Sequence, residues 1–356
     1  MKIVYITNAS FLDHSYTIVK QLKKYNDVHV FLQAKEETGE IREWCSKLDA
    51  AFVIRKRYRN PLSIWDEFKF LYKVRKLRAE KIWFNGITVY QAVIARILLK
   101  NFLVMIHDVK SHLGSKDYFS MAAPKLNLML FREKICAASF SQASLFEKKY
   151  GVSPDVFRLP VIDYYADIGV PARPDVRGDH KISFLFFGTI YPYKGIEILI
   201  EASEILRKKD LEFRLSVFGR LKYNRQLLKR KIDELEFVEF EDEYIDYKNV
   251  HKIFCMHDVL ILPYREVTQC GPLLIGYNAL LPSVCRELPG FREYVDDGES
   301  GLIFGSDAGG LAKKMEMLIR EPGLILKMKE YIKTEIFNKY SIESLYNSYM
   351  DILKKY

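Results

Sequence analysis

The chain has 356 residues, of which 49% are hydrophobic and 28% charged. It is too long for one ordinary core and fits two domains of about 150–200 residues each. Its five cysteines form no CxxC pair, and such an odd set is typical of reduced thiols. The opening MKIVYITNAS predicts a strand and no signal peptide, and no uncharged run reaches the roughly 20 residues of a membrane span. We therefore expect a cytoplasmic protein whose contact with a membrane would be peripheral, at the inner face.

Positive charge is concentrated near the start of the chain. The net charge is +9, and the first hundred residues hold 19 Lys and Arg against 10 Asp and Glu, an excess as large as that of the whole chain. Much of it falls in residues 55–61 and 69–78, and Phe70, Val74 and Leu77 recur there at helical spacing. A basic amphipathic helix fits an anionic lipid surface, whereas a solvated helix face beside a domain core explains the same pattern. No nucleic-acid recognition motif accompanies the charge, so we expect no nucleic-acid partner.

Strand and helix signals alternate from the first residue. The predicted strands are 2–7, 28–33, 50–54, 81–86 and 102–108, and the predicted helices include 16–24, 69–78 and 88–99. Strands separated by helices in this way indicate a parallel sheet with helices on both faces.

The pattern restarts after a segment rich in Pro, Gly and charge at 171–181, which is the best candidate for a linker. The second set of predicted strands is 182–188, 213–219, 238–242, 259–264 and 283–287, and the helices between them are 195–209, 222–235, 247–258 and 272–281. We expect domains at 1–170 and 182–340, and a final helix at 341–356. Two such domains place a ligand cleft where the carboxyl ends of their sheets face each other. Neither domain has a GxGxxG or a Walker-type motif after its first strand, which argues against dinucleotide and P-loop sites.

The first polar cluster is FFGTIYPYKG, at 186–195. A buried strand stops at Gly188, and Lys194 with Gly195 opens a helix. Backbone amides at a helix start and a lysine ammonium converge on one anion, which suits a phosphate. We expect Lys194 to be exposed in the cleft, although a lysine near a helix start is weak evidence by itself.

The second cluster follows the strand at 259–264. A polar loop leads to a helix that we expect to begin at Pro272, and Gly271 lets the chain come close to a ligand. The free amides of Leu273 and Leu274 would then point at a diphosphate. The alternative is an ordinary loop in which Cys270 is a small buried thiol. The segment 287–304 predicts a turn and a short helix that close the domain.

The third cluster, IHDVKSHLG at 106–114, follows a strand of the first domain. It contains His107, a second histidine, an aspartate and a lysine. A lone histidine is more often structural than catalytic, but its expected position opposite the phosphate site favours a functional role.

Three runs carry a family resemblance: FLFFGTIYPYKGIEILIEA, DVLILPYREVTQCGPLLIGYNALLPSVC and GFREYVDDGESGLIF. They resemble the donor-binding half of glycosyltransferase family 4, a retaining family with the GT-B fold. MIHDVKSHLG and KKYGVSPDVFRLPV resemble the acceptor half of a bacterial subgroup, so the resemblance covers nearly the whole chain. It implies an α/β protein of two Rossmann-like domains facing across a cleft, with the C-terminal helix crossing back to the first.

The resemblance also implies roles for particular residues. Lys194 would bind the donor diphosphate, the loop 266–273 would hold sugar and phosphates, and His107 would lie by the reactive carbon of the sugar. The catalytic candidates are therefore His107, Lys194 and Glu266, and the donor-binding candidates are Gly188, Thr189, Lys194, Arg220, Thr268, Gln269, Cys270, Gly271, Pro272 and Leu273. No metal or other cofactor is expected, because positive side chains and helix amides take the role of a cation.

The sequence departs from the family pattern at two positions. Thr189 stands where the family has an arginine, and Leu274 or Ile275 stands where a second, ribose-binding glutamate belongs. Glu266 occupies the place of the first glutamate. Arg220 or Arg265 could supply the missing charge, and the sequence does not decide between them.

The predicted function is transfer of a sugar from a nucleotide-diphosphate sugar to a glycan or lipid-linked acceptor hydroxyl, with retention, in polysaccharide or glycoconjugate synthesis. Catalysis would be mainly electrostatic, because Lys194 and the helix amides would stabilise the departing diphosphate. No carboxylate is placed as a nucleophile, so a covalent intermediate is not expected. One alternative is another GT-B enzyme, either an inverting transferase or an epimerase. The other is a catalytically weak partner subunit of a transferase, which Thr189 and Ile275 favour.

Overall fold

The computed structural model of the chain describes residues 1–55, 62–109, 131–168, 181–235 and 237–356. All of the expected linker 171–181 except Lys181, most of the basic run 55–61 and residues 110–114 of the third cluster lie outside these ranges. The described chain forms two compact units. The first runs to Pro160 and takes up Tyr340–Tyr356, and the second runs from Val161 to Lys339.

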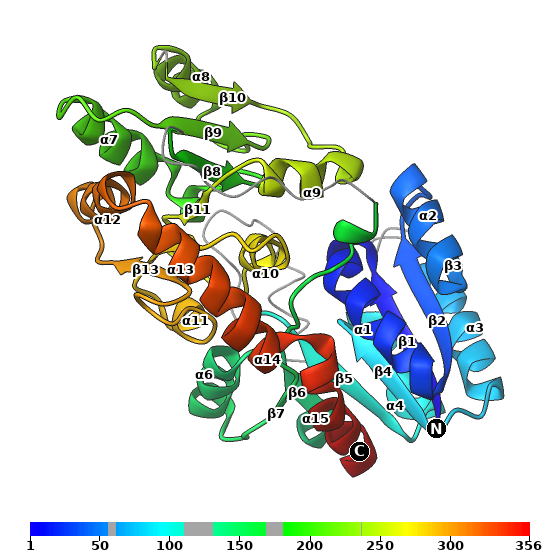
Figure 1. Cartoon of the computed structure of the whole chain (residues 1–356). Helices are drawn as coiled ribbons and strands as arrows, with labels where there is room; N and C mark the ends of the chain where they lie inside the picture. Colours follow the sequence, from blue (N-terminus) through cyan, green and yellow to red (C-terminus); the bar gives the residue numbers. More distant parts are fainter. Residues whose placement is uncertain (56–61, 110–130, 169–180, 236) are drawn as a thin grey trace. The chain divides into compact units, whose positions relative to one another are not determined.

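The first unit contains a parallel sheet of seven strands in the order β3-β2-β1-β4-β5-β6-β7 (Figure 1). Its strands are β1 (Lys2–Asn8), β2 (Asp27–Ala34), β3 (Ala50–Ile54), β4 (Lys81–Asn85), β5 (Phe102–Ile106), β6 (Ile135–Ala137) and β7 (Asp155–Val156). Its helices are α1 (Leu12–Tyr25), α2 (Gly39–Leu48), α3 (Leu62–Lys76), α4 (Val89–Leu98), α6 (Phe140–Tyr150) and α15 (Ile342–Lys355). The sequence predicted β1 to β5 but missed β6 and β7, because strands this short carry no readable period.

Both faces of the first sheet are covered, which is why its central strands are nearly continuous apolar runs. On one face, Val4, Phe84 and Val104 are fully buried against the inner sides of α3 and α4. On the other face, Tyr5 and Trp83 are fully buried.

The last helix, α15, belongs to the first unit. Its Tyr349 ring packs edge-on against Trp83 and Phe157, at centroid distances of 5.8 and 5.1 Å. The Tyr349 hydroxyl donates a hydrogen bond to the carbonyl oxygen of Arg158. The end of the chain therefore completes the core of its first part.

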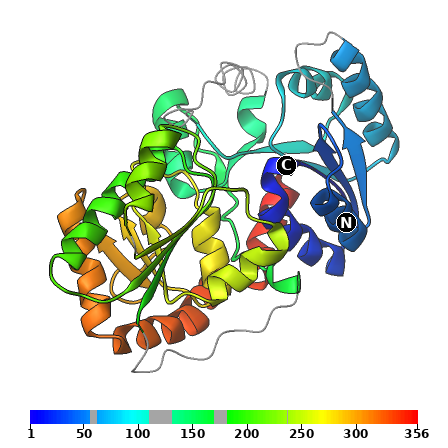
Figure 2. The same ribbon diagram turned by 90° about the horizontal axis from the view of Figure 1, so that it is seen from above.

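The second unit contains a parallel sheet of six strands in the order β10-β9-β8-β11-β12-β13. Its strands are β8 (Ser183–Phe187), β9 (Arg214–Phe218), β10 (Val238–Glu241), β11 (Val259–Leu262), β12 (Ser283–Arg286) and β13 (Gly301–Phe304). Its helices are α7 (Ile196–Arg207), α8 (Arg225–Asp233), α9 (Tyr247–Cys255), α10 (Gly271–Asn278), α11 (Pro289–Arg292), α12 (Ala308–Arg320), α13 (Gly323–Tyr331) and α14 (Phe337–Tyr340), the last reaching the border between the units. Figure 2 shows this sheet with helices on both sides.

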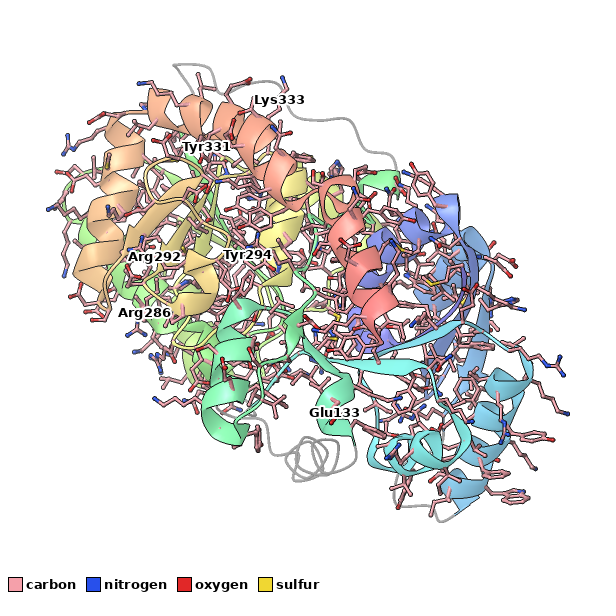
Figure 3. All side chains as sticks on the ribbon, turned by 90° about the horizontal axis from the view of Figure 1, so that it is seen from below. Glu133, Arg286, Arg292, Tyr294, Tyr331 and Lys333 are labelled. Carbon is pink, nitrogen blue, oxygen red and sulfur yellow. The ribbon has the colours of Figure 1, made fainter. Side chains whose placement is uncertain are left out.

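The expectation that residues 287–304 close the second domain is wrong. After α11 the chain returns as β13, which pairs with β12, and α12 and α13 follow. β13 escaped prediction because it begins with glycine, a residue depleted in strands. The turn before it is fixed by hydrogen bonds to Asp296 from Tyr331 (2.9 Å) and Lys339 (2.8 Å), and Figure 3 marks Tyr331 on the helical segment that supplies them.

No helix in the described ranges is both long and apolar enough to cross a membrane. The apolar residues that were expected to form the lipid-facing side of the basic helix lie instead against the core of the first unit. Phe70 and Val74 of α3 are buried in the core of the first unit, and Leu77 packs partly against it. This side of the helix therefore serves the core, as in the alternative interpretation of the sequence.

Candidate functional site

Both sheets reverse their strand order beside their first strand. β1 lies between β2 and β4, and β8 lies between β9 and β11. In an open parallel sheet, ligands bind in the crevice at the carboxyl ends of the strands where the order reverses. Each unit therefore has one candidate site, and the predicted residues fall on both.

In the second unit, the loops after β8 and β9 run side by side. The Gly188 amide donates to the Phe218 carbonyl (2.8 Å), and the Ile190 amide donates to the Arg220 carbonyl (2.9 Å). Thr189 lies between these two contacts. The position where the family has an arginine is thus next to Arg220 of the neighbouring loop.

The loop after β11 is joined to the same turn. The Arg265 amide donates to the Tyr193 carbonyl at 2.6 Å. A Cβ atom on Gly195 would lie 2.2 Å from the Pro263 carbonyl oxygen, so only glycine permits this approach. The two predicted clusters of the second domain therefore meet at the reversal point, between β8 and β11.

Lys194 is buried beneath this junction, with only 7% of its surface exposed. Its ammonium lies 5.4 Å from the centre of the Tyr264 ring and 3.5 Å from the Phe187 carbonyl oxygen. A Cβ on Gly188 would come within 2.8 Å of Nζ, so glycine leaves this ammonium room beside the turn. The expectation that Lys194 is exposed is wrong, because the turn folds under the β11 loop.

Burial lowers the pKa of Lys194 to about 8. The side chain is therefore still mostly protonated at neutral pH. Among the described residues, no carboxylate forms an ion pair with it. A buried cation without a counter-charge is unfavourable, and an anion in the crevice would remove that cost.

The start of α10 differs from the sequence-based expectation. The amides of Leu273 and Leu274 both donate to the Cys270 carbonyl, at 3.1 and 3.3 Å, so they are not free for a diphosphate. Pro272 has no amide proton to offer. Cys270 occupies the N-cap position without a capping bond from its side chain, and burial raises the pKa of its thiol to about 11. At neutral pH the thiol is protonated and is a poor nucleophile.

The remaining loop residues, Glu266, Thr268 and Gln269, are half-buried between β11 and α10. Leu274 and Ile275 are 1% and 4% exposed, so the two positions where the resemblance implies a second glutamate hold core residues. A carboxylate introduced at either position would be in the interior.

The two arginines that could compensate are in different situations. Arg265 forms an ion pair with Glu197 (3.3 Å), and Glu197 also accepts a hydrogen bond from Tyr223 (2.7 Å). Arg220 forms no ion pair with a described residue, and its guanidinium lies 5.2 Å from the centre of the exposed Tyr244 ring. No described acidic side chain therefore neutralises Arg220, whereas Arg265 already has a partner.

In the first unit, His107 follows β5 and is 7% exposed. Its Nε2 lies 2.6 Å from Oδ1 of Asn85, and its ring stacks on Phe11 with centroids 3.9 Å apart. Asn85 ends β4, so the contact lies at the edge of the sheet where the candidate ligand crevice is expected.

Asn85 connects His107 to a second histidine. Its Nδ2 lies 2.8 Å from Ser15 Oγ and 3.1 Å from His14 Nε2, and His14 Nδ1 lies 3.2 Å from Asp13 Oδ1. An amide oxygen only accepts and an amide nitrogen only donates, so His107 carries a proton on Nε2 and His14 accepts on Nε2. Burial raises the pKa of the Asp13 carboxyl, but the contacts with His14 outweigh it and lower that pKa.

Sequence reasoning singled out His107 but missed His14 and Asn85. The sequence did hold a signal for this edge of the sheet, because a polar residue ends each of the two central strands. These residues are Asn8 after KIVYIT and Asn85 after KIWF. Within the described ranges, no group of three or more His, Cys, Asp or Glu side chains could hold a metal ion.

Residues 181–321 match the family model described as "Glycosyl transferases group 1". They extend from β8 through α12 and contain the Lys194 turn and the loop after β11. The match confirms the family resemblance that the sequence showed for this half of the chain.

Among curated proteins, the chain is 25% identical over 209 residues to D-inositol 3-phosphate glycosyltransferase of Pseudarthrobacter chlorophenolicus, covering 55% of this chain and 49% of that protein. The chain spans about half the length of the curated relatives it matches.

Among solved structures, Anabaena HepE in complex with UDP-glucose is similar with a TM-score of 0.75, at 13% identity and with 100% of both chains covered. UDP-GlcNAc 2-epimerase of Neisseria meningitidis is similar with a TM-score of 0.64, at 14% identity and with 100% of both chains covered. At such identities the likeness shows the fold alone. The expected fold class, two Rossmann-like domains of the GT-B type, is confirmed.

The hydrogen-bond chain in the first unit predicts the tautomers of two histidines. In nitrogen-15 NMR spectra at neutral pH, we expect the proton on Nε2 of His107 and on Nδ1 of His14. Asn85→Asp replaces the amide donor by an oxygen that only accepts, so His14 should also take a proton on Nε2 and the signals of both rings should shift. His29, which is half-exposed and distant in sequence, serves as the internal control. Unchanged His14 and His107 signals in this variant would contradict the assignment.

The buried ammonium predicts a pH dependence of stability. The folded state lowers the pKa of Lys194 from 10.5 to about 8, so its destabilising effect is complete below pH 8 and disappears as the pH rises toward 10.5. Lys194→Met keeps most of the volume and removes the charge. Without ligand, we expect it to raise the free energy of unfolding by about 3 kcal/mol at pH 7, with a smaller gain at pH 10. Urea unfolding of both proteins across this range measures the difference, and a difference independent of pH would refute the assignment.

Proposed function

Since residues 181–321 match the family model of the glycosyl transferases group 1, we propose that the protein is a retaining glycosyltransferase. It moves a sugar from a nucleotide-diphosphate sugar to a hydroxyl of a glycan or a lipid-linked acceptor, in the synthesis of a polysaccharide or glycoconjugate. The reaction takes place in the cytoplasm, at the inner face of the membrane. The donor binds at the reversal point of the second sheet.

The observation that carries this proposal is the ammonium of Lys194, buried between β8 and β11 without a carboxylate partner among the described residues. A diphosphate in that crevice supplies the missing negative charge. The structural relative HepE was solved with UDP-glucose, which supports a nucleotide sugar as the ligand of the corresponding fold. Neither a metal nor another cofactor is part of the proposal.

Catalysis is electrostatic in this proposal. The bond between the anomeric carbon and the diphosphate oxygen breaks, and its electron pair passes to the diphosphate, which Lys194 stabilises. The acceptor oxygen bonds to the same face of the sugar, and its proton passes to the departing diphosphate. Cys270 does not act as a nucleophile because its thiol is protonated. Glu266 is proposed to contact the sugar, and a role for His107 beside the reactive carbon remains a prediction from the family resemblance.

Arg220 is the proposed replacement for the arginine that Thr189 lacks. Its carbonyl accepts from the Ile190 amide, so it lies on the loop that runs beside Thr189. Its charge has no acidic partner among the described residues, whereas Glu197 neutralises Arg265. A second cation next to Lys194 explains how the diphosphate is bound without the family arginine.

Two alternative functions predict different experimental results. An inverting transferase or an epimerase has the same donor site but yields a different product, and the solved epimerase shows that this fold accommodates such chemistry. A catalytically weak partner subunit is favoured by the buried Leu274 and Ile275, which cannot hold a ribose through a carboxylate.

The first experiment identifies the donor and tests turnover. Thermal shift with UDP, GDP, ADP and their sugars detects the ligand, because binding stabilises the folded state by RT ln(1 + [L]/Kd). Wild type should turn over the selected donor with retention, read from the anomeric NMR signals of the product. Lys194→Met should remain folded and lose at least about a hundredfold in rate, since one such contact is worth about 3–4 kcal/mol. Inverted product favours the other enzymes, and binding without any turnover favours the partner subunit.

A matched set of variants tests Arg220. Arg220→Ala should weaken nucleotide binding by about ten- to a hundredfold, because a hydrogen bond to a charged group is worth about 1.5–3 kcal/mol. Lys222→Ala removes the same charge from a side chain beside the same Tyr244 ring, at 5.0 Å, and should change the affinity little. Arg265→Ala should also have a small effect. Calorimetric titration gives the three values, and an equal loss in all of them would show a general effect of charge and no specific contact.

A further inference from the structure

The outer side of α3 carries an unusual row of aromatic rings. Trp65 is 58% exposed and Tyr72 is 46% exposed. The Phe68 ring, which is half-buried and also packs against the core, lies between them, stacked on Trp65 at 5.5 Å and on Tyr72 at 6.4 Å. Residues three and four apart lie on the same face of a helix. This row is therefore a ridge along α3, opposite the side that Phe70 and Val74 bury in the core.

The neighbouring helix adds apolar surface on the same side of the unit. The inner sides of α3 and α4 belong to one core cluster, so both helices cover the same face of the first sheet (Figure 1). Their outer sides therefore both point away from that face. On α4, Val93 is 41% exposed and Ile97 is 74% exposed.

Positive charge accompanies the aromatic ridge. The ammonium groups of Lys69 and Lys76 lie 5.8 and 4.8 Å from the centres of the Trp65 and Tyr72 rings. Lys73 and Arg75 are also exposed on α3, and among the described residues none of these four basic side chains has an acidic partner in an ion pair.

The acidic residues of α3 do not balance this charge. Glu67 is buried and paired with Arg55 at 3.2 Å, and Asp66 is half-buried near the start of the helix. The outer side of α3 is thus aromatic and positive along its length.

We propose that the outer face of α3 and α4 docks on an anionic lipid surface. Trp and Tyr side chains favour the level of the headgroups, where their rings reach the apolar region and their polar atoms stay in water. Helices of this composition lie in the plane of the interface. Lysines beside the rings add attraction to anionic headgroups, and their stems remain in apolar contact. The face differs from the one expected from sequence, whose apolar residues serve the core.

The tryptophans of this chain provide a direct readout. It has three, and Trp44 and Trp83 are both fully buried, so Trp65 is the exposed one. With vesicles of phosphatidylglycerol and phosphatidylcholine in equal parts, the emission should move to shorter wavelength and be quenched by lipids brominated on their acyl chains. Vesicles of phosphatidylcholine alone should leave it nearly unchanged. Trp65→Phe should still bind in a flotation assay but lose the spectral change.

Charge reversal tests the electrostatic part. Lys69→Glu, Lys73→Glu and Lys76→Glu together should weaken vesicle binding by about a hundredfold or more, since each basic residue near the surface contributes about fivefold. The matched control changes Lys208, Lys231 and Lys313 to Glu. These three lysines of the second unit are also exposed, so the control changes the net charge by the same amount. It should bind nearly as well as wild type. Binding of wild type should also fall as salt rises.

These measurements do not depend on sugar transfer. The reversal variant should keep its affinity for nucleotide, so a failure of lipid binding and a failure of the donor site are separate results. Equal loss in the control, or vesicle binding with no change in Trp65 emission, would overturn the proposal. So would a dimer in lipid-free solution that Trp65→Ser dissociates, because it would assign the face to a second copy of the chain.

Discussion

The reversal of strand order beside the first strand is the constraint from which both candidate sites follow. On one side of β1 the chain continues to β2, and on the other side lies β4. The same holds for β8 with β9 and β11. Helices leaving adjacent strands toward opposite faces of a sheet separate the loops at that point, and a crevice remains that the strands themselves cannot fill. Side chains from the following turns line it in both units.

The side chains that line this crevice differ in charge and in hydrogen bonding between the two units. In the first, Asn85 joins His14 and His107 into a chain in which donors and acceptors alternate, so the groups satisfy one another. In the second, Lys194 brings a charge and no acidic partner from the described residues, and burial lowers its pKa. The first crevice is pre-ordered without a ligand. An anion would stabilise the second by supplying the missing counter-charge, and this difference is the reason for proposing that the donor binds in the second unit.

Sequence patterns predicted the fold where the physical signal was local. β8, β9 and β11 are apolar runs bounded by glycine or polar residues, and their alternation with helices indicated the parallel sheets. The same reasoning failed where distant contacts decide. Lys194 is buried because Gly195 approaches the carbonyl of Pro263, almost seventy positions later, and no local pattern encodes that approach. The contact between Asn85 and the two histidines likewise joins three separate segments. The sequence therefore identified His107 but not its partners.

The two sides of α3 show why its sequence was ambiguous. A helix that is apolar on two sides is normally covered on both. The sheet covers Phe70 and Val74, whereas lysine side chains lie across the rings of Trp65 and Tyr72 on the other side. The methylene stems of these lysines shield part of the aromatic surface from water, and their charges oppose the approach of a second positive copy. An anionic surface reverses the second effect, because the same charges then attract. In the proposed docking, the lysines that keep this face apart from like-charged protein therefore also select an anionic surface.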